Sequence, residues 1–259
     1  MFLKIIPAFI FLFIISFDIN AEKVHIAVAS NFTQTMKVLV KEFETNSEHT
    51  VSLSFASSGK LYAQIKHGAP FDVFFSADSD KPLLLEKEGL IVTGSRFTYA
   101  LGQLILWSNK HDKLLNIKQK LMQGNFTKLA IANPRLAPYG LAAQQTIENL
   151  GLTEQTLPKW VQGENIMQTL HFISSGNAEL GFVALSQLKD PKALSEFSIW
   201  LVPAALYQPI RQDLVWLNRA KHNPAADEFM QFIHSAKASS IIATSGYKIA
   251  KDSQLDTDL

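Results

Sequence analysis

Apolar positions along the chain follow two periods, one typical of strands and one typical of helices. Residues 23–29, KVHIAVA, are apolar and β-branched, which predicts a buried strand. From Thr33 to Phe43 apolar residues recur at three- and four-residue steps, the spacing of an amphipathic helix. Ser30 and Asn31 lie between the two segments, and both residue types favour helix starts, so we expect them to cap this helix.

The same order of strand, hydroxyl-rich turn and helix recurs downstream. Residues 50–56 predict a second strand, Ser57 and Ser58 a turn, and the next residues a helix that ends at Gly68. The later predicted elements are strands over 71–76, 96–107, 128–132, 180–185 and 214–217, and helices over 81–88, 140–150, 166–173 and a last one from Asn223-Pro224. Alternating strands and helices predict an α/β protein with parallel, doubly wound sheets.

The amino terminus has the pattern of an export signal. Lys4 supplies a positive charge, and Ile5–Phe17 is an almost wholly apolar run of 13 residues, short for a membrane span, which needs about 20. Ala21 offers a small residue for cleavage, so we expect residues 1–21 to be a signal peptide cleaved after Ala21. A retained anchor or a buried strand is the alternative, but the charge order and length fit export better.

Composition narrows the classes of function. Apolar residues make up 47% and charged residues 18%, a globular profile. Lys plus Arg number 24 against 23 for Asp plus Glu, so nucleic acid is not an expected partner. There is no cysteine, which excludes disulfides, thiolate metal sites and the lipid-carrying cysteine of a lipoprotein. An exported protein without a lipid anchor stays where an outer membrane encloses it, so we expect a periplasmic location.

Three turns after predicted strands carry the candidate chemistry: Ser30-Asn31, Ser57-Ser58 and the loop that reaches Tyr139. In a doubly wound sheet such turns lie together at the carboxyl ends of the strands, and each helix start presents free N–H groups and a positive dipole end. Hydroxyl, amide and N–H donors can bind an oxyanion without lysine or arginine. Ordinary helix capping is the alternative, and each turn taken alone would satisfy it.

Other motifs give weaker signals. Lys60 is placed like the lysine of a phosphate-binding loop, but position 54 is serine where that loop needs glycine, so we reject it. The seven histidines lack metal-ligand spacing, and Asp72 and Asp78 are explained as well by strand-end turns as by acid/base chemistry. A serine hydrolase that pairs the Ser57-Ser58 turn with a distant histidine stays open, because triad residues meet only in space. We expect a binding protein rather than an enzyme, without a cofactor.

Four segments resemble a known family. They are AVASNF, SFASSGKLYAQIKHGAPFDVFFSAD, NPRLAPYGLAAQQTIENLGL and GENIMQTLHFISSGNAELGFVALSQ, in this order. Together they resemble the periplasmic molybdate-binding proteins of molybdate ABC transporters, and the likeness covers nearly all of the chain after the signal segment. The resemblance implies a type II periplasmic binding protein of two lobes, each a doubly wound sheet flanked by helices, with the ligand cleft between them.

The resemblance also implies the division of the chain and its partners. Residues 22–102 would form the first part of lobe 1, 103–210 lobe 2, and 211–259 a returning strand and helices that pack back on lobe 1. The protein would capture molybdate or tungstate and deliver it to the membrane permease of an ABC transporter. We expect such a carrier to be a monomer.

The ligand shell of the family can be placed on this chain residue by residue. Ser30 and Asn31 would donate to the anion through side chains and backbone amides, and Ser58 through its hydroxyl. In the second lobe the resemblance implies the backbone N–H groups of Tyr139 and Ile166. Molybdenum would be held through its oxygens by these residues, with no direct protein ligand to the metal.

Neutral donors favour a fully deprotonated tetrahedral dianion. Hydrogen phosphate carries a proton that such a shell cannot accept, which costs about 1–3 kcal/mol. Sulfate has the same charge and shape as molybdate but is smaller, so its rejection depends on cleft size, and sulfate or phosphate stay open as alternative cargo. One branch of the family has a tyrosine hydroxyl where this chain has Ala184, so we expect the other branch's arrangement, which includes Tyr139.

Overall fold

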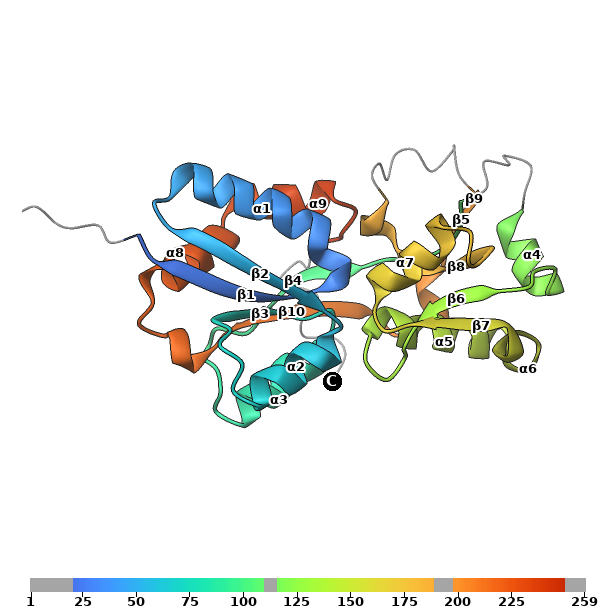
Figure 1. Cartoon of the computed structure of the whole chain (residues 1–259), viewed down its shortest axis with the longest axis horizontal. Coiled ribbons are helices and arrows are strands. Elements are labelled where there is room, and N and C mark those ends of the chain that lie inside the picture. Colours follow the sequence, from blue (N-terminus) through green and yellow to red (C-terminus); the bar gives the residue numbers. More distant parts are fainter. Residues whose placement is uncertain (1–20, 110–115, 189–197, 250–259) are drawn as a thin grey trace, which may run out of the picture.

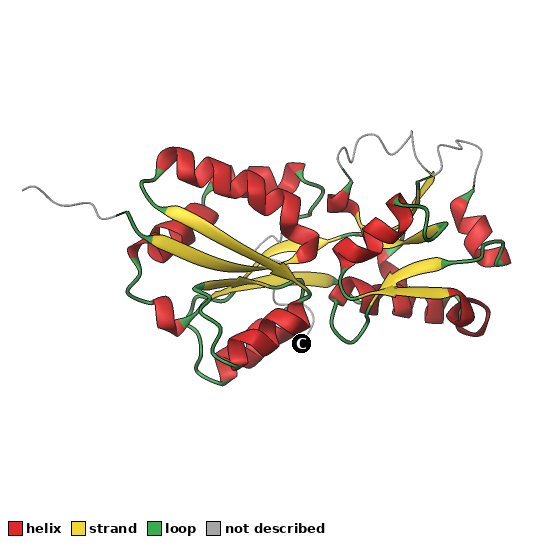
Figure 2. Ribbon diagram, in the orientation of Figure 1, coloured by secondary structure: helices red, strands yellow, loops and turns green. Residues whose placement is uncertain are grey.

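The chain folds into two α/β lobes joined by crossing segments (Figures 1 and 2). The computed structural model describes residues 21–109, 116–188 and 198–249, so all of the predicted signal peptide 1–21 except Ala21 lies outside the described residues. Each lobe holds one five-stranded sheet, with strand orders β2-β1-β3-β10-β4 and β7-β6-β8-β5-β9. The two-lobed α/β architecture expected from the sequence is confirmed. No helix in the described ranges has the length and apolar character needed to cross a bilayer.

The first lobe contains β1–β4, β10 and five helices, and the second contains the remaining elements. In the first lobe these are β1 (Lys23–Ala29), α1 (Thr33–Asn46), β2 (Thr50–Ala56), α2 (Ser58–Lys66), β3 (Val73–Phe75), α3 (Asp80–Lys87), β4 (Phe97–Gly102), β10 (Ile210–Trp216), α8 (Pro224–Ile233) and α9 (Ala236–Thr244). In the second they are β5 (Leu104–Ser108), α4 (Ile117–Gln123), β6 (Leu129–Ala132), α5 (Pro138–Asn149), α6 (Thr153–Thr156), β7 (Trp160–Gly163), α7 (Ile166–Ser174), β8 (Leu180–Ala184) and β9 (Ser198–Leu201).

Both sheets are mixed, which corrects the expectation of parallel sheets. β1 pairs in parallel with β2 and β3, but β10 pairs antiparallel with β3 and β4. In the second lobe β6 is parallel to β7 and β8, whereas β5 is antiparallel to β8 and β9. The antiparallel members β10 and β5 are the strands next to the crossings between lobes, where the chain enters a sheet without a preceding crossover helix.

The single strand expected over 96–107 is wrong. The structure breaks it at Gln103, with β4 in the first sheet and β5 in the second. Both halves have the apolar character of buried strands, so the sequence pattern does not reveal that they belong to different sheets. The expected helix cap at Ser30 and Asn31 is also wrong, because residues Ser30–Phe32 form a short 3-10 helix, η1, and no side chain caps α1.

Successive residues of the central strands pack into opposite layers. Ile26 and Val28 of β1 join a core formed with α1, α8 and α9, whereas Ala27 joins a second core with Leu61 of α2. The second lobe repeats this arrangement, with Leu106 in the core toward α4 and α5 and Ile105 in the core that holds Ile173 of α7. Sheets buried on both faces explain why these strands are continuous apolar runs in the sequence.

Glu179 joins the starts of two strands and a helix in the second lobe. Its carboxylate accepts hydrogen bonds from the Thr127 N–H at 2.7 Å and the Thr127 hydroxyl at 2.6 Å, and from the Lys120 ammonium at 3.0 Å. The hydroxyl bond from Thr127 is the main cause that lowers the pKa of Glu179 from 4.5 to about 2.

We predict that Glu179→Gln lowers the melting temperature at pH 7 and that the difference from wild type shrinks as the pH falls. A carboxylate with a lowered folded-state pKa stabilises the protein above its unfolded-state pKa, and this contribution is lost as pH falls from about 4.5 toward about 2. Thermal unfolding followed by circular dichroism between pH 7 and about 3 measures it, with the exposed Glu154→Gln as control. A gap that is unchanged at the low end would contradict the prediction.

Candidate functional site

The turns after β1 and β2 lie side by side at one edge of the first sheet. β1 and β2 pair in parallel with Ala29 opposite Ala56, so Ser30 and Ser57 leave the sheet at the same level. β3 pairs with the other side of β1, with Val28 opposite Phe75, so the turn after β3 leaves the sheet at the same end of the strands. The structure therefore brings the first two predicted hydroxyl-rich turns together, next to a third turn that sequence reasoning had not included.

The hydroxyl of Ser58 is held by a contact that leaves its hydrogen without an acceptor among the described residues. The residue is 1% exposed, and its Oγ accepts a hydrogen bond from the Ala77 N–H at 2.9 Å. A hydroxyl has one hydrogen and two acceptor positions, so this contact does not use the hydrogen, and the described residues provide no acceptor for it. The backbone N–H of Ser58, at the start of α2, also has no acceptor there, and the buried Oγ of Ser57 has no partner.

Ser30 faces a groove between the lobes. Its hydroxyl makes no hydrogen bond within the described part of the chain. The groove has a volume of about 460 Å³ and is lined by Ser30, Thr33, Phe55, Glu164, Asn165, Met167, Gln168 and His171. Neither lysine nor arginine is among these lining residues, and His171 is the one histidine.

Asn31 uses its side chain inside the protein. Its Nδ2 donates to Oε1 of Gln212 at 2.8 Å and to the hydroxyl oxygen of Tyr247 at 3.0 Å. Both amide hydrogens are therefore committed, in contrast with the side-chain donation that the resemblance implies. The backbone N–H of Asn31, in the first turn of η1, has no acceptor among the described residues, and it is the donor that Asn31 has left.

The second lobe contributes two helix starts. Tyr139 is the second residue of α5, after Pro138, and Ile166 is the first residue of α7. Both residues are at least 97% buried, and neither backbone N–H has an acceptor within the described ranges. The Asn165 side chain caps α7 by accepting from the N–H groups of Met167 and Gln168, and the Ile166 N–H stays free. Free N–H groups at the positive ends of helices attract anions.

Direct contacts hold the two lobes together around these groups. The Gly59 N–H, next to Ser58, donates to the carbonyl of Leu136, in the loop that leads to Tyr139, at 3.0 Å. Lys60 and Glu164 form an ion pair of 2.6 Å across the groove, so the lysine that resembled a phosphate-loop residue is paired with a carboxylate. The arrangement is that of a closed two-lobed molecule.

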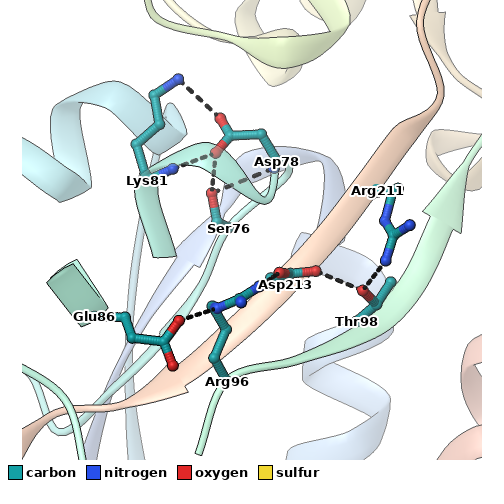
Figure 3. Close-up of polar contacts among 8 residues, drawn as sticks. All are labelled: Ser76, Asp78, Lys81, Glu86, Arg96, Thr98, Arg211 and Asp213. Carbon is teal, nitrogen blue, oxygen red and sulfur yellow. Dashed lines mark hydrogen bonds and ion pairs between the residues drawn. The ribbon is translucent and has the colours of Figure 1, made fainter. Parts of the chain in front are cut away.

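The two candidate acid/base carboxylates have structural partners. Asp78 accepts from the Lys81 N–H at 3.0 Å and pairs with the Lys81 ammonium at 3.1 Å (Figure 3), and burial raises its pKa. Asp72 accepts from the His25 N–H at 2.7 Å and pairs with Arg219. Both support the strand-end turn interpretation. No group of three metal-binding side chains occurs in the described ranges.

Residues 24–248 match the family model of the bacterial extracellular solute-binding proteins. The chain belongs to this family. This solute-binding protein is 48% identical over 228 residues to the molybdate-binding protein ModA of Azotobacter vinelandii, which covers 88% of this chain and 90% of the relative. It is 41% identical to the ModA of Rhodobacter capsulatus, with 88% of each chain covered.

The solved structures agree with this assignment. The solute-binding protein superposes on the Azotobacter vinelandii periplasmic molybdate-binding protein with a TM-score of 0.83 and 38% identity, covering 88% of this chain and 100% of that one. The sulfate-binding protein SubI of Mycobacterium tuberculosis, with 12% identity, a TM-score of 0.68 and 90% and 88% of the two chains covered, shares the fold. The expected type II binding-protein architecture is thus confirmed.

Three residues around the site escaped sequence reasoning: Ser186, Gln212 and Tyr247. They contact one another or Asn31 in the structure, although Gln212 and Tyr247 are 181 and 216 positions from Asn31. Gln212 gave no clear signal, since it lies between Arg211 and Asp213 in the polar half of β10. Ser186 and Tyr247 belong to no motif, so only the fold identifies them.

We predict that Asn165→Ala lowers the free energy of unfolding by about 1 kcal/mol, because the first turn of α7 loses its side-chain acceptor. Urea unfolding followed by circular dichroism measures the change. Asn177→Ala serves as the control, since this exposed asparagine caps no helix, and it should stay within about 0.5 kcal/mol of wild type. Equal stabilities of the two variants would refute the capping role.

Proposed function

We propose that this protein is a periplasmic carrier that binds molybdate, or the similar oxyanion tungstate, between its lobes and delivers it to the permease of an ABC transporter. The observation that carries the proposal is the set of buried donors at the junction of the lobes that have no acceptor among the described residues. The set comprises the hydroxyls of Ser30 and Ser58 and the backbone N–H groups of Asn31, Tyr139 and Ile166. The relatives named as molybdate-binding proteins support the cargo.

Donors of this kind suit a dianion that carries no proton. Each charge-assisted hydrogen bond contributes about 1.5–3 kcal/mol, and several of them can replace the water lost when the anion is enclosed. The three tyrosines nearby, Tyr99, Tyr139 and Tyr247, stay neutral because burial raises the pKa of each. Only the serine oxygens of this set could accept the O–H of hydrogen phosphate, and a serine that accepts it has lost a donor contact, so the site favours molybdate and tungstate over phosphate.

The contacts of Ser58 support binding rather than turnover. The group next to its Oγ is the Ala77 amide, a donor, so within the described residues no base is in place to accept the hydroxyl hydrogen. A serine hydrolase would need such a base. The export pattern of residues 1–21 and the periplasmic relative support release into the periplasm after cleavage at Ala21, and we propose that the carrier acts as a monomer.

Titration calorimetry of the mature protein with molybdate, tungstate, sulfate and phosphate tests this function. We expect molybdate and tungstate to bind with similar affinities, and sulfate and phosphate to bind far more weakly, phosphate because of its proton. Heat released with sulfate but none with molybdate would show that the cargo is a different oxyanion.

We predict that Ser58→Ala weakens molybdate binding at least tenfold, roughly 1.4 kcal/mol, because one donor to the buried anion is lost. Ser76→Ala is the matched control, since this serine is equally buried in the first lobe but its hydroxyl contacts Asp78 (Figure 3). It should keep the wild-type affinity. If Ser58→Ala and Ser76→Ala bind molybdate equally well, Ser58 is not a ligand.

A further inference from the structure

Tyr247 holds Asn31 from two sides. Its hydroxyl oxygen accepts from Nδ2 of Asn31 at 3.0 Å, and its hydrogen can be donated to the Asn31 carbonyl, also at 3.0 Å. The same hydroxyl oxygen accepts from the Ser186 hydroxyl at 2.8 Å. The Tyr247 hydroxyl thus uses its hydrogen and both acceptor positions. Two of the three bonds are with Asn31, in the turn that follows β1, and the third is with Ser186, which faces that turn.

Gln212 holds the other amide hydrogen of Asn31. The side chain is fully buried, its Oε1 accepts from Asn31 at 2.8 Å, and its Nε2 donates to the Tyr139 hydroxyl at 3.2 Å. The next residue of β10, Asp213, accepts from Thr98 at 2.7 Å and pairs with Arg96 at 2.9 Å (Figure 3). These contacts of Asp213 hold β10 and so fix the strand that carries Gln212.

Asn31, Tyr139, Ser186, Gln212 and Tyr247 form one connected set, which we call the Asn31 network. Asn31, Gln212 and Tyr247 belong to the first lobe, whereas Tyr139 begins α5 and Ser186 lies in a 3-10 helix, η3 (Leu185–Gln187), of the second. The network therefore crosses between the lobes from Gln212 to Tyr139, and from Ser186 to both the Tyr247 hydroxyl and, at 3.3 Å, the Asn31 carbonyl.

The second crossing also touches the start of α7. Gln187, the neighbour of Ser186, accepts from the Ala184 N–H at 3.0 Å and donates from Nε2 to the Ile166 carbonyl at 3.1 Å. Ala184 cannot supply a side-chain donor, and its backbone instead fixes the glutamine that holds Ile166. The network thus contacts the Asn31 carbonyl and the Tyr139 side chain, and Gln187, next to Ser186, contacts the Ile166 carbonyl.

Gly102, the last residue of β4, lies against the hydrogen bond between Gln212 and Tyr139. A Cβ at this position would lie 2.3 Å from the Tyr139 hydroxyl and 2.8 Å from Nε2 of Gln212. Any larger residue would push apart the two groups that bond across the lobes. The close approach at the crossing segment between β4 and β5 depends on the absence of a side chain.

We propose that the Asn31 network positions the anion site and is completed only when the lobes close. Gln212, Tyr247 and Ser186 act as positioning residues: the inter-lobe bonds form on closure and hold the backbone N–H of Asn31 where the anion binds. The proposal rests on the proposed function, since the bonds link anion binding to closure. Contacts present only in the closed state shift the equilibrium toward that state and thereby strengthen binding.

Ser186→Ala and Tyr247→Phe, singly and together, test the proposal in the mature protein. Calorimetry gives the molybdate affinity, and stopped-flow mixing gives the association and dissociation rates. We expect Ser186→Ala to bind about tenfold more weakly, through faster dissociation with association changed less than about twofold, because both contacts that it loses cross the lobes and exist only after closure. Tyr247→Phe should also bind about tenfold more weakly, but it loses two bonds to Asn31 within the first lobe as well, so its association should also slow. The Ser186 hydroxyl can still donate to the Asn31 carbonyl in Tyr247→Phe, so the double variant should bind more weakly than Tyr247→Phe alone.

Tyr207→Phe is the matched control. The Tyr207 hydroxyl accepts from the Leu104 N–H at 3.3 Å, and both residues belong to the second lobe, so this tyrosine makes a comparable bond that does not cross the lobes. Its affinity and rates should equal those of wild type. If Tyr247→Phe does not fold, Ser186→Ala carries the test, because it removes one hydroxyl and no packing volume beyond it.

Four outcomes separate the two proposals. Wild-type affinity and rates in Ser186→Ala overturn the positioning role and leave the proposed function intact. A melting temperature that falls equally with and without molybdate, at unchanged affinity, shows a purely structural network and also overturns it. A wild-type protein that binds none of the four anions overturns both proposals. A wild-type protein that binds sulfate instead of molybdate refutes the proposed cargo. The same variants, titrated with sulfate, then test the positioning role of the Asn31 network.

Discussion

The parallel pairing of β1 with β2, Ala29 opposite Ala56, is the constraint on which the site depends. It makes two chain segments turn at one level, so that Ser30 and Ser58 begin adjacent helical segments at the same edge of the sheet. Helix starts have N–H groups that the helix itself cannot satisfy. Burying several such starts together is unfavourable unless something accepts their hydrogens, and a small oxyanion does so without any basic residue.

The N–H groups of Tyr139 and Ile166 lie in the second lobe, so we link anion binding to the closure of the two lobes. In the proposed mechanism an open molecule presents Ser58 and Asn31 on one side and Tyr139 and Ile166 on the other, so the full set of contacts exists only after closure. Selectivity follows from the same arrangement. Neutral donors reward negative charge and penalise a proton on the ligand, whereas separating sulfate from molybdate is left to the size of the closed cleft.

Much of the fold could be predicted because its sheets are buried on both faces. Residues 23–29 and 50–56 are strands as the pattern predicts, and Asn223-Pro224 starts a helix with the asparagine as its cap. The apolar pattern does not locate the boundary between the lobes within 96–107, because a strand that leaves one sheet for another keeps the same apolar character on both sides of Gln103. The division after residue 102 came from the family resemblance. A further helix, α9, follows the one expected to be last.

Only part of the candidate site could be predicted from the residues themselves. Hydroxyl-rich turns after strands are local signals, so Ser30 and Ser58 could be proposed from the residues, whereas the N–H groups of Tyr139 and Ile166 came from the family resemblance. The committed side chain of Asn31 could not be foreseen, since its partners lie 181 and 216 positions away. Contacts of that range are set by how the returning β10 and the segment after α9 meet the first sheet.

A crystal structure of the protein with molybdate, with anomalous data at the molybdenum edge, tests most directly whether uncharged donors alone cage the anion. We expect one strong peak between the lobes, with oxygens in hydrogen-bond distance of the Ser58 hydroxyl and the N–H groups of Tyr139 and Ile166, and no lysine or arginine in contact with the anion. A peak elsewhere, or a basic side chain bound to the molybdate oxygens, would contradict this account of the site.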